Sequence, residues 1–109
     1  MKKSTPKAPP SLSTAARAWW AKLLAEYQIE DGAGLLLLET ALQAFDRMHQ
    51  ARALIEKHGA VTEDRFHQLR PNPATTIERD SRAAMLSALK ALNLDLEPLR
   101  DAAGRPPGR

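Results

Sequence analysis

The sequence predicts a small, mainly α-helical protein with three helices, of which the central one is long, and a short hairpin or loop before the last helix. Three observations lead to this fold class. Apolar residues recur at steps of three and four in three segments, each segment follows a residue that can cap a helix, and the helical period disappears between residues 59 and 73. A chain of 109 residues is long enough for one small domain.

The first helix is expected from Ser13 or Thr14 to Tyr27. Ser11 and Ser13 are candidate N-caps, because a serine hydroxyl accepts from the free amides of the first helical turn. One apolar stripe is formed by Ala16, Trp20, Leu23, Leu24 and Tyr27. Trp19 points away from this stripe, so it lies either at the edge of the core or in contact with a neighbouring molecule.

The second helix is expected from Gly32 to His58, with Asp31 as N-cap and Gly59 as the residue that ends it. Its apolar side contains Leu37, Leu38, Ala41, Phe45, Met48 and Ile55. Leu35 to Leu38 surround the helix almost completely, which in so small a chain favours burial against another protomer. We therefore expect an oligomer interface that includes Trp19, Leu35, Leu36, Leu38 and Leu42.

Residues 59 to 73 lack the helical period and suit a short hairpin or an extended loop. Asn72 can cap the helix that follows, and Pro73 at its first position loses no useful donor. The third helix is expected from Ala74 to Leu92 or Asn93. Its apolar stripe contains Ile77, Ala84, Met85, Ala88, Leu89 and Leu92. Glu78 and Arg82 lie one turn apart, in the order that stabilises a helix.

The two ends of the chain differ from its middle in composition and charge. Residues 1–13 and 98–109 are rich in proline and are expected to be flexible basic tails around a helical domain at 14–97. The net charge is +5 over residues 1–25, −4 over 26–97 and +2 over 98–109. Such ends bind anionic partners or simply keep a protein soluble. The candidate DNA-binding residues are Lys2, Lys3, Lys7, Arg17, Lys22, Arg79, Arg82, Arg105 and Arg109.

The arginines of the last segment and of the third helix leave two interpretations open. Arg105 and Arg109 stand among proline and glycine, as in elements that enter an A·T-rich minor groove, and equally as in a disordered end. Arg79 and Arg82 share one side of the third helix with Lys90. No asparagine or glutamine accompanies them at recognition spacing, so groove reading by this helix has weak support.

Several classes of protein are not expected. The chain has no cysteine, no apolar run long enough to cross a membrane and no signal peptide, so we expect an intracellular protein. It contains no nucleophile elbow, no P-loop and no metal-binding helix motif. His49, His58 and His67 suit surface or helix-end positions. We therefore expect no enzymatic activity, no cofactor and no bound metal.

Taken together, several segments resemble the small terminase subunits of tailed bacteriophages, over about residues 12 to 97. The most specific part is Pro71-Asn72-Pro73-Ala74, followed by Glu78-Arg79-Asp80-Ser81-Arg82-Ala83 and an exit at Leu94-Asp95. Further matching elements are Trp20 with Leu24, Glu26 and Tyr27, then Leu35 to Ala41, Asp46-Arg47, the Ile55 to Gly59 helix end, Thr62 and Asp64-Arg65-Phe66.

The resemblance implies a non-enzymatic protein that assembles into a ring, binds viral double-stranded DNA and presents it to the terminase large subunit, which holds the ATPase and nuclease. It implies action in the host cytoplasm without a membrane. The alternative is a helical interaction adaptor or antitoxin-like regulator with basic tails, whose ends become ordered on a protein partner.

Overall fold

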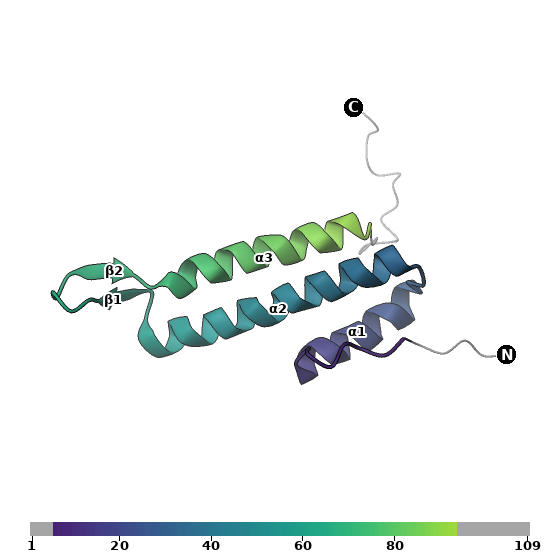
Figure 1. Cartoon of the computed structure of the whole chain (residues 1–109), viewed down its shortest axis with the longest axis horizontal. Helices are drawn as coiled ribbons and strands as arrows, with labels where there is room; N and C mark the ends of the chain where they lie inside the picture. The colour runs from purple at the N-terminus through teal and green to yellow at the C-terminus, as the bar shows by residue number, and fades with distance from the viewer. Residues whose placement is uncertain (1–5, 94–109) are drawn as a thin grey trace, which may run out of the picture.

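The computed structural model describes residues 6–93 of the chain. It contains helix α1 (Thr14–Tyr27), helix α2 (Gly32–His58), strands β1 (Val61–Glu63) and β2 (Leu69–Pro71), and helix α3 (Pro73–Ala91). Antiparallel α2 and α3 lie side by side, the β-hairpin extends from one end of this pair, and α1 packs on α2 (Figure 1). The predicted mainly helical fold, with a long central helix and a hairpin before the last helix, is confirmed.

Local sequence explains where each helix begins. The Ser13 hydroxyl accepts from the Ala16 amide at 3.0 Å, Asp31 accepts from Gly34 at 2.9 Å, and Asn72 accepts from Ala74 at 3.0 Å. Each of these side chains satisfies an amide that has no partner within the helix. Asn72 also donates to the Gly59 carbonyl at 2.8 Å, so the cap of α3 closes the base of the hairpin.

Small residues form the contact between α2 and α3. Ala74, Ser81 and Ala88 are buried on α3 at intervals of seven. The residues of α2 that are buried outside the α1–α2 cluster are mostly small as well: Gly34, Ala41, Ala44, Met48 and Ala51. Small side chains let two helices approach closely. The contact on α3 therefore follows this line. Ile77 and Ala84, which the sequence placed in the buried stripe, lie to one side of it and are exposed.

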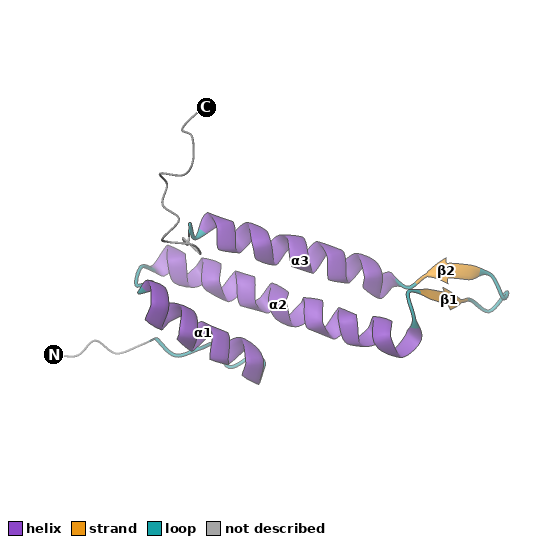
Figure 2. Ribbon diagram, turned by 180° about the vertical axis from the view of Figure 1, so that it is seen from behind, coloured by secondary structure: helices purple, strands orange, loops and turns teal. Residues whose placement is uncertain are grey.

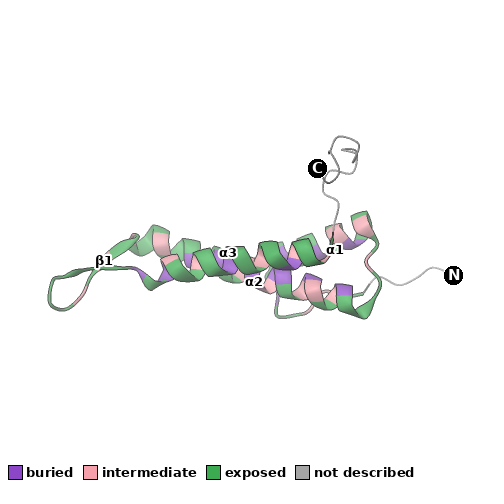
Figure 3. Cartoon of the chain, turned by 90° about the horizontal axis from the view of Figure 1, so that it is seen from above, coloured by how far each residue is buried: buried purple, intermediate pink, exposed green. Residues whose placement is uncertain are grey.

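The core between α1 and α2 is built differently, from larger side chains. Its buried cluster consists of Leu12, Ala16, Trp20, Leu24, Leu38 and Leu42. Helices α1 and α3 each pack on α2 but hardly on one another, so the three helices form an open arrangement rather than a closed bundle (Figure 2). Within the helices, burial is accordingly concentrated on the sides that face a neighbouring helix, while the hairpin is mostly exposed (Figure 3).

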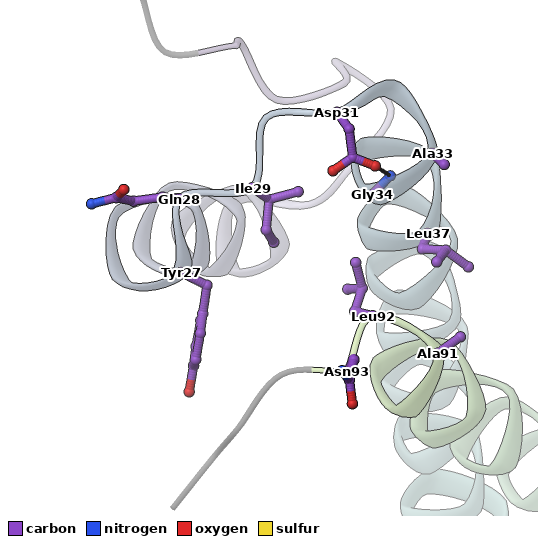
Figure 4. A pocket seen from close by; sticks show the side chains of 10 residues that line it. All are labelled: Tyr27, Gln28, Ile29, Asp31, Ala33, Gly34, Leu37, Ala91, Leu92 and Asn93. Carbon is purple, nitrogen blue, oxygen red and sulfur yellow. Dashed lines mark hydrogen bonds between the residues drawn. The ribbon is translucent and has the colours of Figure 1, made fainter. Parts of the chain in front are cut away.

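The connection from α1 to α2 is tight. Gln28 takes a left-handed conformation with φ of 51° and ends α1, and four residues later Gly32 begins α2. A Cβ on Gly34 would lie 2.8 Å from Ile29 Cγ2 and 2.9 Å from Asp31 Oδ1, so a side chain at this position would force these neighbours to move. Beside the connection, an open pocket of about 560 Å³ lies between the end of α1, the start of α2 and the end of α3 (Figure 4).

Candidate functional site

The segment before α1 lies against the helices. We call residues 6–13 the N-terminal strap. Leu12 is buried in the core between α1 and α2, and the Trp20 indole Nε1 donates to the Pro6 carbonyl at 3.0 Å. Ser13 donates to Asp46 of α2 twice, from its amide at 2.9 Å and from its hydroxyl at 2.6 Å. Residues 6–13 belong to the tail that the sequence predicted to be flexible, yet the structure packs them on α1 and α2.

The strap and α1 carry three exposed cations. Lys7, Arg17 and Lys22 are exposed, and no acidic residue occurs before Glu26. Lys22 lies 4.0 Å from Glu26 and 5.4 Å from the centre of the Trp19 ring. Lys7 and Arg17 form no ion pair with any residue in the range 6–93. The other candidates at the chain ends, Lys2, Lys3, Arg105 and Arg109, lie outside the described residues.

The arginines of α3 have acidic partners. Glu78, whose side chain is 12% exposed, accepts from Arg82 at 2.9 Å and from Arg52 of α2 at 3.0 Å. The predicted Glu78–Arg82 pair is thus confirmed, and Arg79 lies 3.5 Å from Asp80. These pairs partly offset the positive charge of Arg79 and Arg82. Sequence reasoning missed Arg52, because a residue 26 positions away on another helix leaves no local signal.

The five residues predicted at an oligomer interface occupy three different environments. Trp19 and Leu36 are exposed, at 43% and 64%. Leu35 is partly buried against the α1–α2 core. Leu38 and Leu42 are fully covered within that core, and α1 of the same chain supplies the cover. Their burial therefore needs no neighbouring protomer, and only Trp19 and Leu36 remain strongly exposed.

The hairpin is exposed but well ordered by its own hydrogen bonds. The Asp64 carboxylate accepts from the amides of Phe66 and Gln68 at 2.8 and 3.0 Å, and from Arg70 Nε at 3.1 Å. These donors, the Gln68 amide above all, lower the pKa of Asp64. The tip nevertheless exposes apolar surface, with Phe66 at 68% and Leu69 at 74%. The sequence, with Phe66 and Leu69 among the residues considered, predicted a hairpin or an extended loop here but assigned these two side chains no function.

Neither a metal-binding group nor a membrane-spanning helix is found among the described residues. Between residues 6 and 93, no group of three or more His, Asp or Glu side chains is arranged to hold a metal ion. Among the helices in that same part of the chain, none combines the length and the apolar character needed to cross a bilayer.

The comparison with protein families decides the relationship. The family described as phage terminase, small subunit, matches residues 16–98. The chain belongs to this family. No curated protein and no solved structure shows significant similarity to the chain. Membership supports a role in phage DNA packaging, in agreement with the resemblance noted from the sequence. The match covers α2, the hairpin, α3 and all of α1 except its first two residues, and it begins after the strap.

Proposed function

We propose that this terminase small subunit binds viral double-stranded DNA without catalysis, as a ring oligomer in the host cytoplasm, and hands it to the terminase large subunit. The observation that supports DNA binding most directly is the set of exposed cations on the strap and α1. Lys7, Arg17 and Lys22 are exposed there, and Lys7 and Arg17 have no acidic partner among the described residues. Such cations neutralise phosphates irrespective of sequence, so binding is expected to weaken steeply with salt.

Ring assembly would turn a weak contact into a strong one. A single protomer offers few cations, whereas several protomers in one ring present theirs at high effective concentration. Linking binding sites in this way raises overall affinity by about 10² to 10⁴ without new contacts. The net charge of −4 over residues 26–97 would meanwhile oppose indiscriminate coating of DNA by the rest of the protein.

The open arrangement of the helices supports the assembly. A chain in which α1 and α3 both pack on α2 leaves helix surfaces uncovered, and Trp19 and Leu36 are large apolar residues on such surfaces. We propose that these two side chains contribute to the contact between neighbouring protomers. A repeated contact between two different surfaces of one chain closes into a ring when its rotation permits.

The assembly can be tested by size-exclusion chromatography with light scattering at micromolar concentration. We expect a discrete oligomer, and Trp19→Ser together with Leu36→Ser should shift it towards monomer. Thr40→Ser, a small change at an exposed position of α2, is the matched control. A strictly monomeric full-length protein would contradict the ring.

DNA binding is tested separately with a labelled duplex at several salt concentrations. Deleting residues 1–10 and 104–109 should abolish binding if the ends supply the contacts. Unchanged binding after both deletions would instead assign the DNA site to the helices, with Arg79, Arg82 and Lys90 as the first candidates.

The exposed hairpin tip favours a second candidate function, that of a helical interaction adaptor. Phe66 and Leu69 are apolar, exposed and held on a tip whose backbone is fixed by Asp64. Preorganised apolar side chains are typical of protein contacts. Absence of duplex binding by the full-length protein at low salt would favour the adaptor over the DNA-binding subunit.

A further inference from the structure

We propose that Asp46 of α2 is a positioning residue for DNA binding: it anchors the N-terminal strap to the helices and so holds the exposed Lys7 in a fixed place beside α1. The inference rests on the proposed DNA binding, but the anchor itself can be measured without DNA. The strap lies before the residues that the family match covers, whereas Asp46 lies within them.

The Asp46 carboxylate holds Ser13 at two points. Its two carboxylate oxygens accept from two different atoms of Ser13, the amide at 2.9 Å and the hydroxyl at 2.6 Å. Hydrogen bonds to an ionised acceptor are shorter and stronger than those between neutral groups. A two-point contact of this kind fixes both the position and the orientation of Ser13 relative to α2. It joins residues 33 positions apart in the chain.

Ser13 in turn holds the start of α1 and the position of Leu12. Its hydroxyl donates to Asp46 and at the same time accepts from the Ala16 amide at 3.0 Å, so the cap of α1 and the anchor on α2 share one oxygen. The residue before it, Leu12, is buried at 2% exposure. Fixing Ser13 therefore determines where Leu12 enters the core and from which point the strap continues.

Hydrogen bonds also hold the strap on either side of Lys7. The Leu12 amide donates to the Pro9 carbonyl at 3.1 Å, which closes a turn, and the Pro6 carbonyl accepts from Trp20. Lys7 lies between these two fixed points and is exposed. A cation held in place before DNA arrives gives up less conformational entropy on binding than one on a free chain.

The negative charge of Asp46 and its role as an anchor have opposite expected effects on DNA binding. Asp46 is an acid beside an otherwise basic segment, so by charge alone its presence weakens the attraction for phosphate. If only net charge mattered, removing the carboxylate would tighten DNA binding. If Asp46 acts by anchoring the strap, removing it releases Lys7 and weakens binding, although the protein becomes more positive. The two interpretations predict opposite signs.

The experiment compares Asp46→Ala with Glu56→Ala in the full-length protein. Glu56 is an exposed acid on the same helix, about 15 Å further along its axis at 1.5 Å per residue, and forms no ion pair with a described residue. Both variants remove one negative charge, but only the first removes the anchor. The DNA probe is a labelled 30-base-pair duplex of arbitrary sequence at low salt.

The anchor is read out by thermolysin, which cleaves before leucine. With the strap docked, the Ser11–Leu12 bond is protected, because Leu12 is buried. We expect Asp46→Ala to speed cleavage there and to weaken duplex binding about threefold to tenfold, the effect of freeing one or two side chains. Glu56→Ala should leave cleavage unchanged and bind DNA as well as or better than the unmodified protein. Circular dichroism checks that both variants remain helical.

The outcomes separate the proposal from the function on which it rests. Equal tightening of DNA binding in both variants would overturn the positioning role, as would unchanged cleavage at Leu12 in Asp46→Ala. If the unmodified protein fails to bind the duplex, the proposed function fails and the positioning role with it, while the cleavage rates still establish the anchor. Should Asp46→Ala not fold, Ser13→Ala removes the hydroxyl bond from the other side without changing the charge. This variant must then also speed cleavage before Leu12 and weaken duplex binding.

Discussion

The two contacts that α2 makes on its different sides are built on opposite principles. Against α3 it packs along most of its length through small residues such as Ala44 and Ser81. Against α1 it packs over a shorter stretch through a few large side chains, Trp20 foremost, with polar anchors at Asp46. The first contact distributes its free energy over many positions, and the second concentrates it in a few. We therefore infer that α2 and α3 form the scaffold, and that α1 with its strap can separate from it.

The largest expected effect comes from removing Trp20, the main side chain of the contact between α1 and α2. Trp20→Ala should cost about 3–5 kcal/mol, the usual penalty for deleting a buried aromatic ring. Because this loss falls on α1, hydrogen exchange should accelerate in α1 and the strap while α2 and α3 remain protected. Uniform acceleration in all three helices would contradict the separation. Ala21→Ser, at an exposed position of the same helix, is the control and should leave the pattern unchanged.

The contact between α2 and α3 should be more sensitive to a larger side chain than to the loss of one. Ala44 is fully buried between the helices, so Ala44→Leu has no space for its added atoms. Overpacking of this kind costs about 1–3 kcal/mol. We expect a lower Tm in thermal unfolding followed by circular dichroism, with loss of α2 and α3 together. Ala83→Leu, the same substitution at an exposed position of α3, should leave Tm nearly unchanged, and an equal drop there would refute a tight contact at Ala44.

The elements of this fold were predictable wherever the signal is local. Asp31 and Asn72 cap the helices that follow them, and a cap needs only the next two or three residues. The long-range pairs were not predictable. The all-round apolar start of α2 shows that Leu38 requires cover, but not that α1 of the same chain supplies it. The basic end was visible in the sequence, whereas its anchor, Ser13 on Asp46, joins residues that only the fold brings together.

The connection between the two regions offers a smaller effect with an internal control. A Cβ at Gly34 would fall within 3.0 Å of Ile29 Cγ2 and Asp31 Oδ1, whereas one at Gly32 would meet nothing within 4 Å. Gly34→Ala should therefore destabilise the α1–α2 connection by about 1–3 kcal/mol through overpacking. Gly32→Ala should stabilise by up to about 1 kcal/mol, because alanine loses less entropy in a helix. Equal shifts of Tm in the two variants would be inconsistent with this geometry.

The smallest effect lies at the hairpin, which extends the α2–α3 scaffold but has no core of its own. Because its hydrogen bonds lower the pKa of Asp64, the folded tip favours the carboxylate, and the contribution is complete above the ordinary pKa of 3.8. It is lost as pH falls below that value, when protonation removes the acceptor for the Phe66 and Gln68 amides. We expect these two amide signals in NMR spectra to lose protection at low pH while those of α2 and α3 persist. Asp64→Asn should abolish this pH dependence. If loosening of the tip begins well above the ordinary pKa of 3.8 instead, a group other than Asp64 controls the turn.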